Sequence, residues 1–220
     1  MIFPAAQPAF GAQFPRQPPG IAERCGDLLL ASSARLGFIE IGDVVGENVV
    51  DLAGRTFGRG AWVHPRLDCL LRTARGGAAR SFKTAVSTDS ATLVAAVRAA
   101  ADRRVEALLS SARGAGRIAP GSDVARAAFE QGTAKLILVA TDGRATAQAG
   151  FVGVAASRGM AILWGTKDRI GRAIARPETA VVAILDDGFA EAIARAIALV
   201  AIPDAGTDRA ASDEALVEVR

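Results

Sequence analysis

The 220-residue chain is poor in the side chains that most often hold metals, with two cysteines and one histidine, and it has no tyrosine. Structural zinc sites need four ligands, usually cysteine and histidine. Cys25, Cys69 and His64 cannot complete such a set without carboxylates, so we expect no metal site. The chain starts without a basic segment before an apolar core. We therefore expect no secretory signal, and a cytoplasmic protein with reduced cysteines and no structural disulfide.

Long hydrophobic runs are also missing. The longest, Ala196–Ile202, has seven residues, whereas a membrane-spanning helix needs about 20, so we expect no membrane partner. Half of the residues are hydrophobic and 22% are charged, which is typical of a folded globular chain. The length allows one large domain or two small ones.

Motifs of catalysis and cofactor binding are missing as well. No GxSxG motif lies near His64, no GxGxxG follows a strand-like run, and there is no Walker-type phosphate loop. Asp186 and Asp187 follow an apolar run, but neighbouring strand residues point to opposite faces, which makes them poor joint metal ligands. We expect a protein that is not an enzyme and that uses no cofactor.

Charge is present but unevenly distributed. The formal net charge is only +3. Residues 98–176 nevertheless hold 13 basic and 6 acidic residues, and residues 177–220 hold 3 basic and 9 acidic residues. This asymmetry predicts a surface that binds polyanions and an acidic C-terminal segment that is solvated or regulatory.

The first part of the chain has the pattern of a small, strand-rich unit. Met1–Gly20 holds five of the nine prolines, and we expect it to lack a fixed fold. Two β-type runs follow, and glycines such as Gly42 are predicted to form turns between them. A third extended piece ends at His64. The predicted elements are strands at Phe38–Ile41, Val49–Leu52 and Gly58–His64, and a helix at Asp68–Arg75 that Gly76 ends.

The second part alternates between helices and strands. The run KLILVAT (Lys135–Thr141) is continuously apolar, which is typical of a strand buried on both faces. Strands that alternate with helices of about ten residues predict a three-layer α/β/α sandwich. The predicted helices are Thr88–Ser111, Asp123–Gln131, Thr146–Arg158, Lys167–Ala175 and Phe189–Leu199, and the predicted strands are Arg117–Ala119, Lys135–Thr141, Met160–Trp164 and Thr179–Leu185.

Two stretches near the front resemble a known family. VVDLAGR (Val49–Arg55) is followed by GRGAWVHPRLDC (Gly58–Cys69) and a short basic helix. In this order the residues resemble the YlxR family of small bacterial RNA-binding proteins, over about residues 36–84. The resemblance implies a small α+β unit that binds RNA. The family usually opens with an arginine and then a Cys-x-x-Cys pair, of which only Arg24 and Cys25 remain here.

A second resemblance covers about residues 100–203. It is carried by GSDVARAAFEQGTAKLILVATD (Gly121–Asp142), TKDRIGRAI (Thr166–Ile174) and VVAILDDGFAEAIARAI (Val181–Ile197). These stretches resemble the kink-turn-binding ribosomal protein superfamily. The predicted organisation is therefore a disordered Pro-rich segment (1–20), a YlxR-like basic domain (21–84), a helical linker (85–99), a ribosomal-protein-like α/β/α domain (100–203) and a flexible acidic tail (204–220).

Seven residues of the first unit are candidates for RNA binding. Arginine pairs bidentately with phosphates and stacks on bases, glycines beside an arginine let the backbone approach a phosphate, and aromatic rings stack on unpaired bases. Alternatively, the tryptophan is core, the glycines form a tight turn and the arginines are a solvated face. The candidates are Arg55, Gly58, Arg59, Gly60, Trp62, His64 and Arg66.

Seven more candidates lie in the second unit. Ser122 is predicted to cap a helix whose N-terminus suits a phosphate, Asp123 to accept from a base and Arg126 to share its face. Simple helix capping explains the same pattern. Basic residues near Gly171 and before the central strand are predicted to form the opposite wall of an RNA groove, or to be surface charge paired with Asp168. The candidates are Gly121, Ser122, Asp123, Arg126, Lys135, Lys167 and Arg169.

The sequence thus predicts a non-catalytic bacterial protein that recognises structured RNA. The resemblances imply ribosomal RNA or the RNA of ribonuclease P, and a link to translation, transcription or RNA processing. The alternative is a protein-interaction adaptor of the ribosome or the transcription apparatus, with only non-specific RNA affinity.

Overall fold

The computed structural model describes residues 39–44, 47–52, 60–82, 89–143 and 150–203. The predicted segments 1–20 and 204–220 lie outside them. The chain divides into two units. Unit 1 holds the described residues from Arg103 to Ala198, and unit 2 holds those before Arg103 together with Leu199 to Pro203. The boundaries lie within two helices, α3 (Ser90–Gly114) and α8 (Asp187–Val200).

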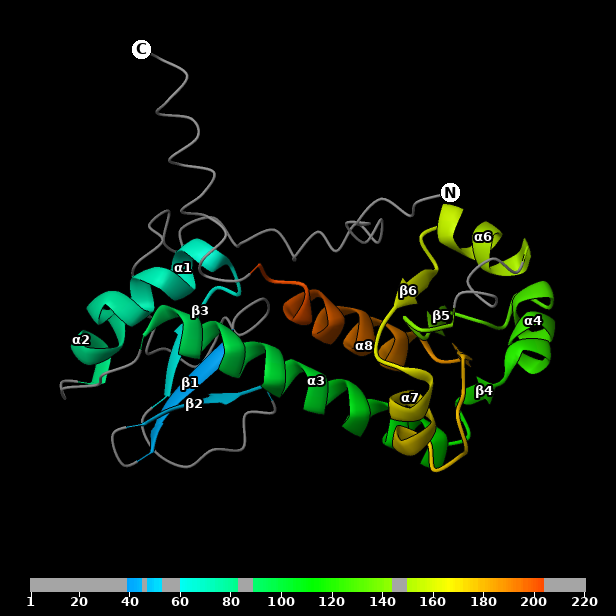
Figure 1. The fold of residues 1–220 in the computed structure, drawn as a ribbon, viewed down its shortest axis with the longest axis horizontal. Helices are drawn as coiled ribbons and strands as arrows, with labels where there is room; N and C mark the ends of the chain where they lie inside the picture. Colours follow the sequence, from blue (N-terminus) through cyan, green and yellow to red (C-terminus); the bar gives the residue numbers. More distant parts are fainter. Residues whose placement is uncertain (1–38, 45–46, 53–59, 83–88, 144–149, 204–220) are drawn as a thin grey trace, which may run out of the picture. The chain divides into compact units, whose positions relative to one another are not determined.

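Unit 2 contains a three-stranded antiparallel sheet with strand order β2-β1-β3 (Figure 1). Gly42 lies inside β1, opposite Val49 and Gly60. The expectation that Gly42 forms a turn is therefore wrong, because pairing on both sides fixes a backbone that glycine alone would leave flexible. The strands are β1 (Ile39–Val44), β2 (Glu47–Asp51) and β3 (Gly60–Val63).

Helical turns follow the sheet of unit 2. Helix α1 (Leu67–Arg72) leads into the π-helical turn η1 (Thr73–Gly77) and then into α2 (Ala78–Phe82). Gly76 interrupts the helical path with φ of +116°, a backbone conformation that glycine adopts without a steric penalty. The prediction that Gly76 ends the first helix is confirmed, whereas α2 was not expected.

The core of unit 2 draws on three parts of the chain. Ile41 and Val63 come from the sheet, Leu70 from α1, and Val97 from α3; Ile202 comes from the C-terminal part. The backbone carbonyl of Ile202 accepts a bond of 2.8 Å from Arg98 Nε. The segment predicted as a linker (85–99) thus contributes residues to this core. Without them, the strands and α1 would form only a small core.

Cys69 in α1 is buried and disulfide-bonded. The expectation of reduced cysteines is therefore wrong for Cys69. Its backbone carbonyl accepts a bond of 2.9 Å from Thr73 Oγ1, so this buried hydroxyl is satisfied within the helical segment.

The sheet of unit 1 is mixed, with strand order β4-β7-β5-β6. Strand β5 pairs in parallel with β6, and β7 runs antiparallel to both β4 and β5. The strands are β4 (Ile118–Pro120), β5 (Leu136–Val139), β6 (Ala161–Leu163) and β7 (Val181–Ile184), and the helices besides α3 and α8 are α4 (Ser122–Glu130), α6 (Gly150–Ser157) and α7 (Lys167–Ala173).

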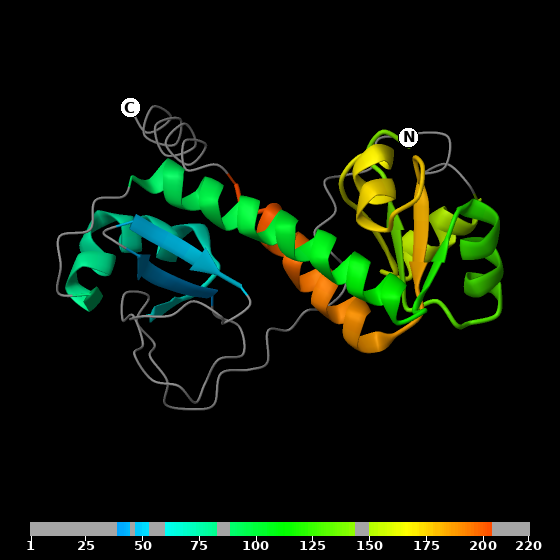
Figure 2. The same cartoon turned by 90° about the horizontal axis from the view of Figure 1, so that it is seen from below.

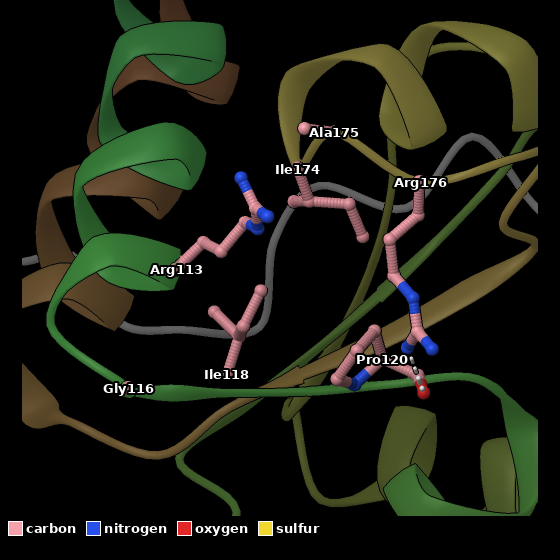
Figure 3. Close-up of a pocket in the computed structure, with 7 residues that line it drawn as sticks. All are labelled: Arg113, Gly116, Ile118, Pro120, Ile174, Ala175 and Arg176. Atoms are coloured by element: carbon pink, nitrogen blue, oxygen red, sulfur yellow. Dashed lines mark hydrogen bonds between the residues drawn. The ribbon is translucent and has the colours of Figure 1, made fainter.

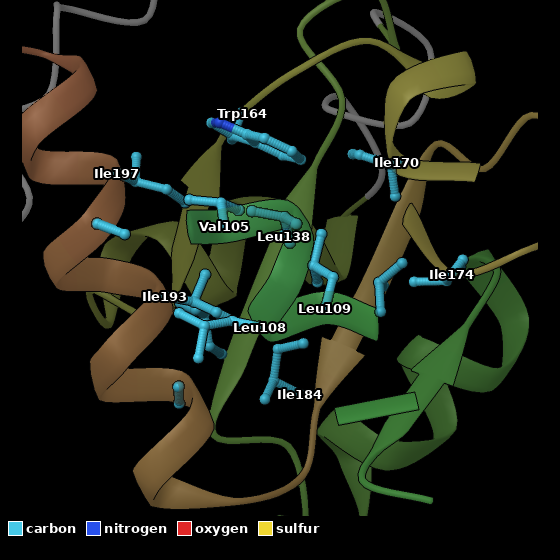
Figure 4. Packing of buried hydrophobic residues seen from close by; sticks show 14 of the residues in the cluster. Val105, Leu108, Leu109, Leu138, Trp164, Ile170, Ile174, Ile184, Ile193 and Ile197 are labelled. Carbon is cyan, nitrogen blue, oxygen red and sulfur yellow. The ribbon is translucent and has the colours of Figure 1, made fainter. Parts of the chain in front are cut away.

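Helices cover both faces of this sheet. On one face Leu138 and Ile184 pack against α3, α7 and α8 in a cluster that includes Leu109 and Ile193 (Figure 4). On the other face the neighbouring strand residues pack against α4 and α6. Figure 2 shows α4 (green) and α7 (yellow) on opposite sides of the strands. The predicted three-layer α/β/α sandwich is confirmed, because alternate residues of β5 and β7 serve opposite faces and all are buried.

Candidate nucleic-acid interface

One edge of the unit 1 sheet gathers five of the seven candidate residues of that unit. The carboxyl ends of β4, β5 and β6 meet there with the start of β7, because β7 is antiparallel. Backbone hydrogen bonds connect the segments: Gly121 N donates to Val181 O (2.9 Å), and Thr179 N donates to Lys167 O (3.0 Å). We call this the α4/α7 edge, formed by residues 121–126, 140–142, 165–167 and 179–181.

The N-terminus of α4 lies at this edge without a side-chain cap. The N-cap residue is Gly121, with φ of +101°, and no side chain of the described residues accepts a hydrogen bond from the first turn. The prediction that Ser122 caps the helix is wrong, because Ser122 is already the first helical residue. The N-cap position is taken by Gly121, whose positive φ is a conformation that glycine adopts easily. The uncapped first turn leaves backbone N–H groups for an anion.

Arg126 is held on the exposed side of α4 by an aromatic ring. Its guanidinium carbon lies 5.5 Å from the centre of the Phe151 ring, while that of Arg158, directly after α6, lies 5.3 Å from the centre of the Phe129 ring. The two rings are 6.3 Å apart. This crossed pair of cation–π contacts joins α4 to α6 and orients Arg126 while leaving its donors accessible.

Lys167 lies at the start of α7, on the same edge. Thr166 caps the helix, its hydroxyl accepting from Arg169 N at 3.2 Å. The Lys167 backbone N–H donates to Asp142 Oδ1 at 2.9 Å, which fixes the residue without using its ammonium group. No carboxylate of the described residues forms an ion pair with Lys167 or Arg126.

Asp142 is a member of this edge that the sequence analysis missed. It follows the apolar run that forms β5, so its position after a buried strand was a signal for it. With Asp123, which is exposed on α4, Asp142 places carboxylates among the cations. The α4/α7 edge therefore offers acceptors as well as donors and is not a uniformly positive groove.

Two basic candidates lie away from the α4/α7 edge. Lys135 precedes β5 and so lies at the opposite edge, where its Nζ is 3.2 Å from Asp187 Oδ2. Arg169 faces α3: its Nε is 2.7 Å from Glu106 Oε1, and its guanidinium lies 4.8 Å from the Trp164 ring centre. Arg172 pairs with Asp168 at 2.7 Å, which is the surface pairing that the sequence left as an alternative.

The candidates of unit 2 are only partly described. Gly60 and Trp62 belong to β3, where Trp62 is opposite Glu40 of β1. Arg66 is exposed, and its Nε lies 3.3 Å from Asp68 Oδ1. Such a surface ion pair contributes little to stability, so Arg66 can exchange it for a phosphate. Arg55, Gly58 and Arg59 lie outside the described residues.

His64 follows β3 and is half-buried. Burial lowers the pKa of its imidazole, the charge of Arg66 lowers it further, and Asp68 raises it. The imidazole is therefore neutral at pH 7, so it suits stacking or a neutral hydrogen bond more than pairing with a phosphate.

The lowered pKa of His64 predicts a pH-dependent stability. A histidine that binds protons more weakly in the folded state contributes stability above its unfolded pKa of about 6.5, and that contribution declines as the pH falls toward the folded pKa. We expect urea midpoints of the whole protein to decrease as the pH falls from 7 to 5.5, and His64→Gln to reduce this decrease. An equal decrease in both proteins would contradict the role of His64.

None of the described helices is long and apolar enough to cross a membrane. Within the same residues, no group of three or more histidine, cysteine or acidic side chains is placed to hold a metal ion.

Comparisons with known proteins find a similarity in structure only. No protein-family model and no curated protein matches the chain. A protein of unknown function from Bacillus halodurans is 24% identical, with a TM-score of 0.39, over 44% of this chain and 96% of its own. The 15.5kD RNA binding protein of Giardia lamblia is 22% identical, with a TM-score of 0.39, over 46% of this chain and 90% of its own. We draw no functional conclusion from similarities of this size.

Proposed function

We propose that this protein binds structured RNA through the α4/α7 edge of unit 1 and catalyses no reaction. The observation that carries the proposal is that the uncapped N-terminus of α4, with Arg126 one turn further on, and the start of α7, with Lys167, lie at the same edge of the sheet. Neither cation is paired with a carboxylate of the described residues, so each is available for a phosphate.

The carboxylates of the same edge support recognition of bases. Asp123 is exposed in the first turn of α4, one turn from Arg126. A carboxylate beside a phosphate-binding group accepts from the amino or imino groups of an unpaired base, and sequence-specific RNA recognition mostly targets such bases. The RNA we propose is therefore one with unpaired bases next to a helical backbone, rather than a uniform duplex.

The finer assignment rests on resemblance. About residues 100–203 resemble the kink-turn-binding ribosomal protein superfamily, and about residues 36–84 resemble the YlxR family. These resemblances support ribosomal RNA or the RNA of ribonuclease P as the target, in a bacterial and cytoplasmic setting. Ser122 stands where the superfamily has asparagine, so we propose a relaxed form of that specificity.

A salt titration tests RNA binding against the adaptor alternative. The full chain is titrated with fluorescently labelled ribosomal RNA fragments and with ribonuclease P RNA at several salt concentrations. We expect affinity to fall steeply with salt, because each phosphate contact releases counterions. Absent binding, or binding that salt leaves unchanged, would contradict the proposal and favour the adaptor.

A further inference from the structure

A hollow of about 370 Å³ lies beside β4, within unit 1. It is bordered by the C-terminal end of α3, by β4 and by the connection from α7 to β7 (Figure 3). Its volume is at the lower end of the range of small-molecule pockets, about 300–1,000 Å³. The lining residues are Arg113, Gly116, Ile118, Pro120, Ile174, Ala175 and Arg176.

Two arginines border this hollow from different segments. Arg113 extends from α3 and Arg176 from the α7–β7 connection (Figure 3). Neither forms an ion pair with a carboxylate of the described residues. Within the part of the chain that the structure describes, Arg176 donates only a long bond of 3.5 Å, from Nη1 to Pro120 O. Two such guanidinium groups at one hollow form a site for an anion, and for phosphate in particular.

The wall between the arginines is apolar. The Ile174 side chain is fully buried beneath it, and Ile118 and Pro120 are half-buried. A small inorganic anion alone would leave this surface exposed to water. The ligand that fits the hollow therefore has a flat or apolar body in addition to its charge.

Strand β4 adds a recognition edge to the hollow. It is the outermost strand on this side of the sheet. Arg117 O accepts from Leu185 N, and Gly121 N donates to Val181 O, both at 2.9 Å. Since neighbouring strand residues direct their backbone groups to opposite sides, the N–H and C=O of Ile118 face away from β7. One donor and one acceptor so placed match the edge of a nucleobase.

The same edge is poorly suited to a peptide. A peptide that adds a strand to a sheet needs regularly spaced donors and acceptors. Pro120, the next residue with backbone groups on that side, has no N–H. Only one donor therefore remains on this short strand.

We propose that this hollow binds a nucleoside 5′-phosphate, with the phosphate between Arg113 and Arg176 and the base against the apolar wall at Ile118. The ligand is a free mononucleotide or the terminal nucleotide of an RNA chain, which present the same chemistry. The site is separate from Arg126 and Lys167, so it goes beyond the function proposed above.

Calorimetric titration of the full chain with AMP, GMP, CMP and UMP tests the proposal. At least one nucleotide is expected to bind saturably, and its nucleoside and inorganic phosphate to bind at least about tenfold more weakly, because each makes only part of the contacts. Arg113→Gln and Arg176→Gln are each expected to weaken binding about tenfold. Arg195→Gln, which removes an exposed charge from α8, is the matched control and is expected to change nothing.

A second arm separates the two sources of the ligand. A 5′-phosphorylated RNA tetranucleotide and its 5′-hydroxyl form are titrated alongside the mononucleotides. Binding of the mononucleotides themselves assigns a free nucleotide. Binding of the phosphorylated tetranucleotide alone, weakened by the same two variants, assigns an RNA terminus.

The outcomes that overturn the proposal are equally specific. They are no binding in either arm, or binding that Arg113→Gln and Arg176→Gln leave unchanged. Thermal unfolding checks that both variants fold; should Arg176→Gln unfold, Arg113→Gln decides the test. The Arg126→Gln, Lys167→Gln double variant is expected to bind the nucleotide as the parent protein does, because both substitutions lie outside the hollow. Failure of RNA binding at the α4/α7 edge can therefore be distinguished from failure of nucleotide binding in the hollow.

Discussion

Replacing Gly171 with alanine is expected to destabilise unit 1 strongly. Gly171 is buried in α7, and a Cβ atom there would lie 2.3 Å from Pro177 O and 2.9 Å from Arg176 O. Both are backbone atoms, which move only if the connection to β7 moves. Overpacking in a well-packed region costs about 1–3 kcal/mol and occasionally more, and we expect the upper part of this range because the clash is with backbone.

The measurement is urea unfolding followed by the fluorescence of Trp164, which is buried in unit 1, in a Trp62→Phe background. Gly153→Ala is the matched control. Gly153 is exposed in α6, and its added Cβ would meet nothing within 4 Å, so alanine is expected to stabilise the helix by about 0.5–1 kcal/mol. Equal midpoints for Gly171→Ala and the parent protein would show that the chain does not approach α7 this closely.

Removing the two cations of the α4/α7 edge is expected to have the largest effect on RNA binding. Charge-assisted hydrogen bonds contribute about 1.5–3 kcal/mol each. Arg126→Gln and Lys167→Gln are therefore each expected to lower RNA affinity about tenfold or more. Lys167→Gln keeps the backbone bonds to Asp142 and Thr179, so its stability is expected to stay near that of the parent protein.

Arg126 needs a separate control because it also contacts Phe151. Loss of an exposed cation–π contact costs about 0.5–1 kcal/mol, which thermal unfolding will register as a small shift. Arg126→Lys keeps the charge and is expected to recover part of the RNA affinity. Arg195→Gln, on α8, is expected to bind RNA like the parent protein. Normal RNA binding by Arg126→Gln and Lys167→Gln would contradict the assignment of the edge.

Hydrophobic runs made the layers of unit 1 predictable from the sequence. The stretches that form β5 and β7 are continuously apolar because helices cover both faces of the sheet. The direction of β7 was not predictable in the same way. A buried strand has the same apolar composition whether it pairs in parallel or antiparallel. Only the structure shows that β7 is antiparallel, so that its start lies beside the carboxyl ends of the other strands.

The candidate site was predicted only where its residues are close together in the sequence. Gly121, Asp123 and Arg126 lie within six consecutive residues at the start of α4, so local sequence was enough to group them. Lys135 was grouped with them by its charge, yet it lies at the opposite end of β5 and pairs with Asp187. Arg113 and Arg176 are far apart in the chain, and only the folded structure brings both to one hollow.

The most direct test of the central claim is the salt dependence of RNA affinity for the parent protein and for the Arg126→Gln, Lys167→Gln double variant. Each phosphate contact contributes about 0.7–0.9 to the slope of log affinity against log salt. We predict that the double variant binds more weakly at low salt and that its slope is shallower by about 1.4–1.8. Identical slopes and affinities for the two proteins would contradict RNA binding at the α4/α7 edge.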